Sequence, residues 1–171
     1  MSASDEKAPE VSANPAAQAA FERGQEYYKK KDYDSAIKEY TEAIGLNPDV
    51  SIFYTTRGNA YYRSIGQYDN AISDYTKAIK LDPDFNFFDY ASRGRAYCAN
   101  KKYNKAICDL TESIRLWPDK DIPAIVYECR GRAYFFLKEY DKAISDYTEA
   151  LRLDPENEEV RELLREAQGR G

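Results

Sequence analysis

The chain of 171 residues contains no histidine and only three cysteines. Without histidine, a nucleophile activated by an imidazole base is excluded, and a zinc site lacks its usual imidazole ligands. Cys98, Cys108 and Cys129 are odd in number and lack the spacing of a metal-binding pair, so we expect reduced thiols. The sequence therefore predicts no metal and no cofactor.

Long apolar runs are also missing. No stretch approaches the roughly eighteen apolar residues of a membrane-spanning helix, and Met1 to Asn14 has no apolar core of a signal peptide. The formal net charge is −5, whereas nucleic-acid-binding proteins usually carry a basic balance or a basic stripe. We therefore expect a cytoplasmic protein that binds neither membranes nor nucleic acid.

What the chain does contain is an internal repeat. An Arg-Gly pair followed three residues later by tyrosine occurs four times, at intervals of 34, 36 and 37 residues, and its glycines are Gly24, Gly58, Gly94 and Gly131. An alanine follows twelve or thirteen residues later, and a proline always comes twelve residues after that alanine. These pairs are Ala36 and Pro48, Ala71 and Pro83, Ala106 and Pro118, and Ala143 and Pro155. Self-similarity with this period predicts a stacked array of helices.

Each unit is predicted to form two antiparallel helices. In the first helix, tyrosines recur four residues before and three after the glycine, on one buried face; they are Tyr54, Tyr90, Tyr127, Tyr27, Tyr61, Tyr97 and Tyr134. A glycine inside a helix costs about 1 kcal/mol relative to alanine, so we expect another helix backbone to pass too close for a Cβ atom. The second helix should begin after a tyrosine and an N-cap residue, which is Asp34, Asp69, Asn104 or Asp141.

The series of glycine, tyrosine, alanine, aromatic, alanine and proline resembles the tetratricopeptide repeat family from about Pro15 to Pro155. The resemblance implies an all-α fold, a right-handed α-solenoid of four helix hairpins plus a C-terminal capping helix. The expected segments are a disordered tail at 1–14, repeats within 15–155 at about 15–48, 49–83, 84–118 and 119–155, and a capping helix at 156–171. The apolar face of that last helix would comprise Val160, Leu163, Leu164 and Ala167.

One position departs from the family pattern. The residue before each glycine is usually leucine in the family, but here it is Arg23, Arg57, Arg93 or Arg130. Every unit also has an acid three residues after its alanine: Glu39, Asp74, Asp109 and Asp146. We predict that an arginine–carboxylate pair links the two helices of each unit.

In this family the first helices line a concave groove, and the resemblance implies that divergent positions on them contact a ligand. The candidate peptide-binding residues are Gln25, Tyr28, Asn59, Tyr62, Phe88, Arg95, Glu128, Arg132 and Phe135. The row directly after the glycines changes from amides, Gln25 and Asn59, to guanidinium groups, Arg95 and Arg132. We therefore predict an extended peptide with acidic or C-terminal carboxylates at one end. Its apolar anchors would be Phe88, Phe135, Tyr28 and Tyr62.

These features favour a non-catalytic protein–protein interaction module, an adaptor or scaffold that binds a peptide or helix of a partner protein. The alternative is a self-associating homo-oligomer that assembles through Phe85, Phe87, Phe88 or Trp117. An enzyme is not expected, because no set of catalytic side chains converges. The family's carboxylate clamp for chaperone C-termini is absent, since its positions hold Phe21, Gln25, Thr56, Phe88 and Ser92.

Overall fold

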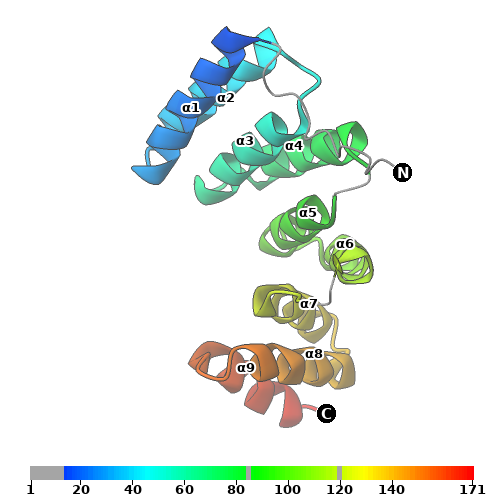
Figure 1. The fold of residues 1–171 in the computed structure, drawn as a ribbon. Helices are drawn as coiled ribbons and strands as arrows, with labels where there is room; N and C mark the ends of the chain where they lie inside the picture. Colours follow the sequence, from blue (N-terminus) through cyan, green and yellow to red (C-terminus); the bar gives the residue numbers. More distant parts are fainter. Residues whose placement is uncertain (1–13, 84–85, 119–120) are drawn as a thin grey trace, which may run out of the picture.

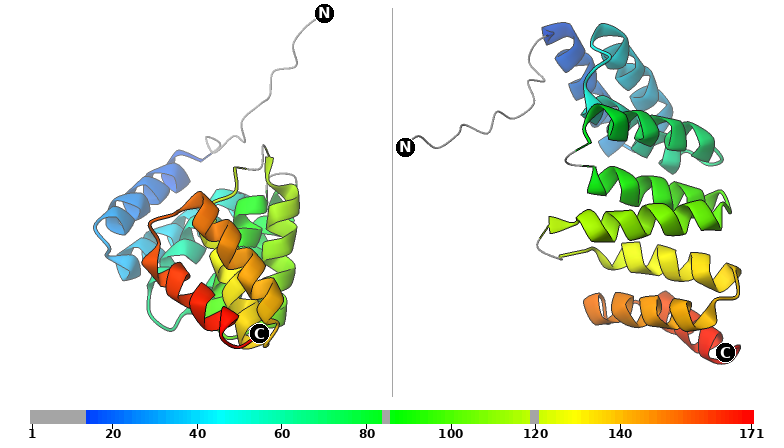
Figure 2. Two further views of the ribbon diagram at one scale, coloured as in Figure 1. Left: turned by 90° about the horizontal axis from the view of Figure 1, so that it is seen from below. Right: turned by 90° about the vertical axis from the view of Figure 1, so that its right-hand side faces the viewer.

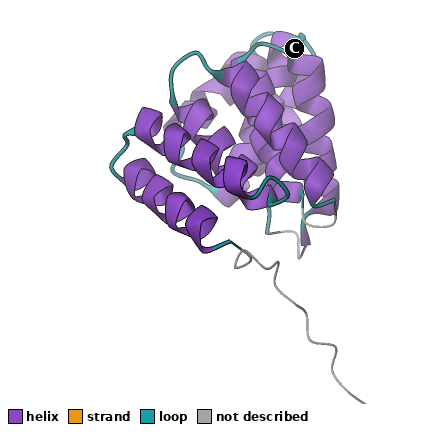
Figure 3. Cartoon of the chain, turned by 90° about the horizontal axis from the view of Figure 1, so that it is seen from above, coloured by secondary structure: helices purple, strands orange, loops and turns teal. Residues whose placement is uncertain are grey.

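The computed structural model describes residues 14–83, 86–118 and 121–171. The predictions made for residues 1–13 and for Phe85 lie outside the described residues. The described residues form only helices and loops, and none of them lies in a strand (Figure 3). The predicted all-α fold class is therefore confirmed.

Four helix hairpins and one further helix follow one another along the chain. The first helices of the hairpins are α1 (Pro15–Lys29), α3 (Ser51–Arg63), α5 (Phe87–Ala99) and α7 (Ala124–Phe136). The second helices are α2 (Tyr33–Leu46), α4 (Tyr68–Leu81), α6 (Tyr103–Leu116) and α8 (Tyr140–Leu153), and α9 (Glu158–Gln168) comes last. None of the described helices has the length and apolar character needed to cross a bilayer.

The hairpins stack in sequence order, so that α1 and α9 lie at opposite ends of the array (Figure 1). Each first helix packs against the second helix of its own hairpin, and each second helix packs against the next first helix. A view from the side shows the hairpins as successive layers (Figure 2). This arrangement is the predicted solenoid of four hairpins plus a C-terminal helix.

The structure shows a capped start at α1 and corrects the four N-caps predicted for the second helices. Asn14 caps α1, because its Oδ1 accepts hydrogen bonds from the amides of Ala16 and Ala17 at 3.1 and 3.2 Å. The four second helices begin at the tyrosine itself, so the residues predicted as N-caps, Asp34, Asp69, Asn104 and Asp141, already lie inside the first turn. The three aspartates still stabilise their helices there, because a negative charge in the first turn complements the helix dipole.

The repeated glycines accommodate side chains of the second helices, not a helix backbone as predicted. A Cβ atom on Gly24 would lie 2.5 Å from the ring of Tyr40, and one on Gly94 would lie 2.7 Å from Leu110. Cβ atoms on Gly58 and Gly131 would lie 2.9 and 2.8 Å from the rings of Tyr75 and Tyr147. Each of these large side chains follows the repeated alanine by four residues and is fully buried. The glycine thus makes room for the largest core residue of its hairpin.

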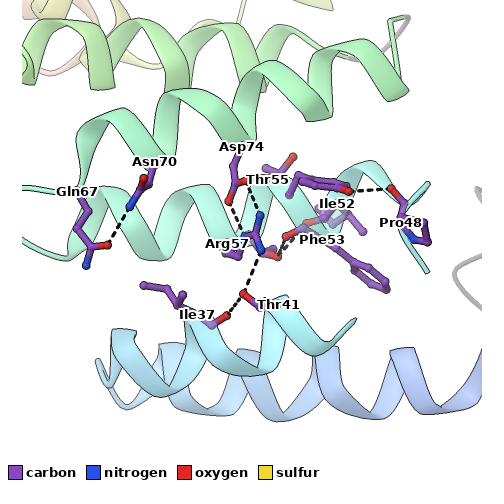
Figure 4. Close-up of polar contacts among 12 residues, drawn as sticks. Ile37, Thr41, Pro48, Ile52, Phe53, Thr55, Arg57, Gln67, Asn70 and Asp74 are labelled. Carbon is purple, nitrogen blue, oxygen red and sulfur yellow. Dashed lines mark hydrogen bonds and ion pairs between the residues drawn. The ribbon is translucent and has the colours of Figure 1, made fainter. Parts of the chain in front are cut away.

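The four predicted arginine–carboxylate pairs are confirmed. Arg57 donates through Nε and Nη2 to both oxygens of Asp74 at 2.8 Å each (Figure 4). Its Nη1 donates to Thr41 Oγ1 on the preceding hairpin at 3.0 Å. Figure 4 shows the guanidinium group between α4 and α2, so a single side chain joins three helices.

The same arrangement recurs at the next two junctions. Arg93 binds Asp109 at 2.7 and 2.9 Å and Thr76 at 3.0 Å, while Arg130 binds Asp146 at 2.8 Å twice and Thr111 at 3.1 Å. We call Arg57, Arg93 and Arg130, with their aspartates and threonines, the arginine ladder. Arg23, in the first described hairpin, pairs with Glu39 and Glu42 at 2.7 and 3.3 Å.

A further buried carboxylate, Asp89, connects the second and third hairpins. Thr55 on α3 donates to Asp89 Oδ1 on α5 at 2.8 Å. Burial raises the pKa of Asp89 to about 6, although the hydrogen bond from Thr55 acts in the opposite direction. This carboxyl group therefore opposes folding more strongly when it is ionised.

Candidate peptide-binding groove

Two adjoining pockets lie along the first helices. The N-terminal pocket has a volume of about 140 Å³ and is lined by Tyr28, Asn59, Tyr62, Arg63, Tyr75, Ser92 and Arg95. The C-terminal pocket has a volume of about 280 Å³ and is lined by Tyr62, Arg95, Cys98, Ala99, Tyr103, Ile125, Glu128, Cys129, Arg132 and Phe136. Because both are lined by Tyr62 and Arg95, they form one groove that extends over all four hairpins.

Six of the nine candidate residues line this groove, namely Tyr28, Asn59, Tyr62, Arg95, Glu128 and Arg132. All six belong to first helices, on which residues three and four apart share one face. Whether they bind a peptide remains a prediction. The structure shows only that they are brought together.

The other three candidates lie elsewhere. Gln25 is exposed on α1 and lines neither pocket. Phe88 is 57% exposed and packs against Phe87 in a tilted contact and against Trp117 in an edge-on contact, with ring centroids 4.5 and 4.8 Å away. Phe135 packs against Tyr140, with 5.6 Å between centroids. The two phenylalanines thus make local aromatic contacts, which leaves neither of them as an anchor inside these pockets.

The apolar wall of the C-terminal pocket comes from residues that the sequence analysis did not select. Tyr103, at the start of α6, and Phe136, at the end of α7, stack with their rings 9° from parallel and 4.8 Å apart. Phe136 lies five residues after the glycine, a row that otherwise contains Lys29, Arg63 and Ala99. Three members of that row line the groove, so its variation along the chain was a signal that could have found them.

Arg95 is the cation shared by both pockets. Its guanidinium carbon lies 5.3 Å from the ring centroid of Tyr62, within cation–π distance. Among the described residues it forms no ion pair, and its buried Nε has no hydrogen-bond partner. Arg63, which lines the N-terminal pocket, likewise forms no ion pair with any described residue. The middle of the groove is therefore cationic in a chain whose formal net charge is −5.

Arg132 differs from Arg95 because carboxylates already surround it. Glu128 on α7 lies 3.0 Å from its Nη2, and Glu159 on α9 lies 2.6 Å from the same nitrogen. Asn157 additionally donates to Glu128 at 3.4 Å. Arg132 is therefore already paired, whereas Arg95 is paired with no carboxylate among the described residues.

The remaining polar groups of the groove form hydrogen bonds within the chain or stay protonated at neutral pH. Burial raises the pKa of Cys98 to about 12 and that of Cys129 to about 11, so both thiols stay protonated at neutral pH. Cys98 donates to the carbonyl of Cys129 at 3.1 Å. Tyr75 donates to Asn59 Oδ1 at 2.8 Å, which leaves the Asn59 amide nitrogen as a donor. Within the part of the chain that is described, no cluster of acids and cysteines is arranged to hold a metal ion.

A larger hollow of about 400 Å³ lies outside the groove. It is lined by the α7–α8 turn and by Arg170 and Gly171. Its walls carry Lys138 and Lys142 together with Glu139 and Asp141, and Lys142 and Glu139 are already paired. With charges of both signs in contact, this hollow offers no clear ligand preference.

The array and its grooved face define a helical-repeat scaffold for protein interactions. A family profile described as "Tetratricopeptide repeat" matches residues 52–85 and 124–157, and one described as "TPR repeat" matches residues 24–64. Together they cover more than half of the chain. The chain belongs to the tetratricopeptide repeat family, whose members act as protein-interaction modules.

Individual relatives match with different coverage. Human serine/threonine-protein phosphatase 5 is 44% identical over 57 residues, which are 29% of this chain and only 11% of the phosphatase. A structure of MamA from Desulfovibrio magneticus RS-1 has a TM-score of 0.82 at 22% identity and covers 92% of this chain and 86% of that chain. The TPR2B domain of yeast Sti1, in a structure titled as a complex with pHsp70, has a TM-score of 0.66 at 27% identity, with coverage of 72% and 99%.

Proposed function

We propose that this chain is a non-catalytic adaptor that binds an acidic segment of a partner protein in its groove. The observation that carries the proposal is Arg95, a partly buried cation at the junction of the two pockets with no ion-pair partner among the described residues. Guanidinium groups form strong charge-assisted hydrogen bonds with carboxylates. A carboxylate of the partner therefore provides what Arg95 lacks.

The shape of the groove supports a peptide over a large cofactor. The C-terminal pocket, at about 280 Å³, is close to the lower limit of about 300 Å³ for small-molecule sites. Its aromatic wall, formed by Tyr103 and Phe136, suits an apolar side chain beside the carboxylate. Asn59, in the neighbouring pocket, provides a donor for a peptide carbonyl.

The likeness to the Sti1 domain is consistent with peptide binding, because that structure is titled as a complex with pHsp70. The contacts must nevertheless differ from those of the family's carboxylate clamp. The clamp positions hold Phe21, Thr56 and Ser92 here, and none of these carries a positive charge. We therefore assign recognition of the carboxylate to Arg95.

The experiment is a selection of random heptapeptides displayed with either a blocked or a free C-terminus. Wild-type protein should enrich peptides that contain a carboxylate next to an apolar residue. Arg95→Gln should bind the selected peptides about 10- to 100-fold more weakly, as expected for loss of a hydrogen bond between charged groups. The control is Arg115→Gln, which removes an exposed arginine from α6.

Two results would contradict the proposal. One is selection of peptides without any acidic preference. The other is an equal loss of affinity in Arg95→Gln and Arg115→Gln, which would indicate an effect of net charge alone. Comparison of the blocked and free C-termini also shows which carboxylate the groove uses.

Self-association is the second candidate, and the aromatic cluster of Phe87, Phe88 and Trp117 is the observation that favours it. Phe87 and Trp117 are half-buried, and their centroids lie 4.8 Å apart. Only Phe88 is well exposed, so most of this apolar surface is already covered within one molecule. Light scattering over a range of concentrations, with Phe88→Ser as the variant, tests this alternative.

A further inference from the structure

The C-terminal helix ends the array, and it also places a carboxylate on one of the groove residues, Arg132. Val160 and Ala167 of α9 are buried against α8, and this contact brings the first turn of α9 next to α7. Glu159 in that turn forms an ion pair with Arg132, at 2.6 Å, from a position 27 residues further along the chain. A carboxylate of this chain thus occupies the place where a ligand carboxylate would bind.

The charges around Arg132 show what this contact does. Glu128 is nearly buried, with 11% of its side chain exposed, and it already compensates the charge of Arg132. Glu159 is 70% exposed and adds a second negative charge on the same nitrogen. Arg132 with both carboxylates therefore carries a net charge of −1, whereas Arg95 remains a free cation.

We propose that Glu159 is a specificity-determining residue that acts as a built-in carboxylate on Arg132 and restricts the groove to ligands with a single acidic group, bound at Arg95. A second ligand carboxylate next to α9 would meet a net negative charge and would have to displace Glu159. The part of this inference that concerns peptides rests on the proposed function. The occupation of Arg132 by Glu159 can be tested without any peptide.

The direct test uses succinate as the probe and the NMR signal of the Arg132 Nε–Hε group as the readout. Glu159→Ala removes the exposed carboxylate, whereas Glu162→Ala removes the same charge from an exposed residue of α9 that forms no ion pair in the described part of the chain. Succinate should saturate the signal at a roughly two- to fivefold lower concentration in Glu159→Ala than in wild type, as expected for removing a partly exposed ion pair. Glu162→Ala should behave like the wild-type protein.

Equal midpoints in the two alanine variants, or no change in either, would overturn the inference. Thermal unfolding of both variants verifies that α9 remains folded. The second arm repeats the peptide selection with two variants. Glu159→Ala should enrich peptides with two acidic residues. The double variant Glu159→Ala with Arg132→Gln should not enrich them. An unchanged selection by Glu159→Ala also contradicts the inference, while failure of Arg95→Gln to weaken binding contradicts only the proposed function.

Discussion

Arg93 and Arg95 lie two residues apart on α5, yet only Arg93 is paired with a carboxylate among the described residues. Arg93 forms two hydrogen bonds with Asp109 and one with Thr76, and equivalent arginines occur at the same position of every hairpin. Arg95 has no ion-pair partner among the described residues and has a counterpart only in Arg132. This contrast indicates that a polar position repeated in every hairpin maintains the scaffold, whereas a position that varies along the array is available for recognition.

The largest expected effect comes from breaking the arginine ladder. Arg93→Gln should lower the free energy of unfolding by about 3–5 kcal/mol, because it leaves Asp109 buried without a counter-charge. Arg115→Gln removes an equally well-formed pair with Glu112 at the surface and should cost less than about 1 kcal/mol. Urea denaturation measures both values. Equal losses in the two variants would contradict a special role for the ladder.

The double variant Arg93→Met with Asp109→Leu sharpens the same point. Replacing both charges by apolar groups of similar size should recover most of the lost stability, since neither residue is then left unpaired. A double variant as unstable as Arg93→Gln would instead show that the hydrogen bond to Thr76 is the main contribution.

The repeated glycines provide the next contrast. Gly131→Ala should destabilise the protein by about 1–3 kcal/mol, because the new Cβ would lie 2.8 Å from the ring of Tyr147. Gly45 is not part of the repeat, and a Cβ there meets no atom within 4 Å. Gly45→Ala should therefore stabilise α2 by up to about 1 kcal/mol. Thermal unfolding of the two variants should shift the midpoint in opposite directions.

Asp89 is a buried carboxylate outside the ladder, and it predicts a dependence on pH. Its pKa is raised to about 6 from an ordinary value of 3.8, so the folded state binds the proton more tightly than the unfolded state. The contribution of Asp89 to stability should therefore fall as pH rises from about 4 to 6. Asp89→Asn should remove this loss and increase stability at pH 7 by about 1–3 kcal/mol, with no gain near pH 3.5.

The matched control for Asp89 is Asp49→Asn, which changes an exposed aspartate before α3. Urea denaturation at several pH values should give parallel curves for Asp49→Asn and wild type. A gain of stability in Asp89→Asn that is independent of pH would show that ionisation is not its cause.

The smallest expected effect is on the stability of Arg95→Gln. Since Arg95 forms no ion pair with a described residue, its loss should change the free energy of unfolding by less than about 0.5 kcal/mol. The comparison with Arg93→Gln then separates scaffold from groove within one turn of one helix. A loss above about 2 kcal/mol would place Arg95 with the scaffold.

The sequence was sufficient to predict the solenoid and the arginine pairs, because a repeated contact leaves the same residue types at fixed spacing. It also located six groove residues on the first helices. Phe88 was misplaced because Trp117, from a connection of irregular length, provides a local aromatic partner. The Arg132–Glu159 pair was missed because α9 lies outside the repeat, so no periodicity indicates which side chain it brings to α7.

The junction between α8 and α9 is built differently from the three junctions before it. Leu164 stands nine residues after Pro155, where Arg57 stands nine residues after Pro48, and Thr148 has no arginine partner among the described residues. Detachment of α9 would thus expose apolar surface and separate Glu159 from Arg132, which would still be paired with Glu128. The last helix is thus joined to the array by apolar contacts and by the partly exposed Arg132–Glu159 pair, and not by a further rung of the arginine ladder.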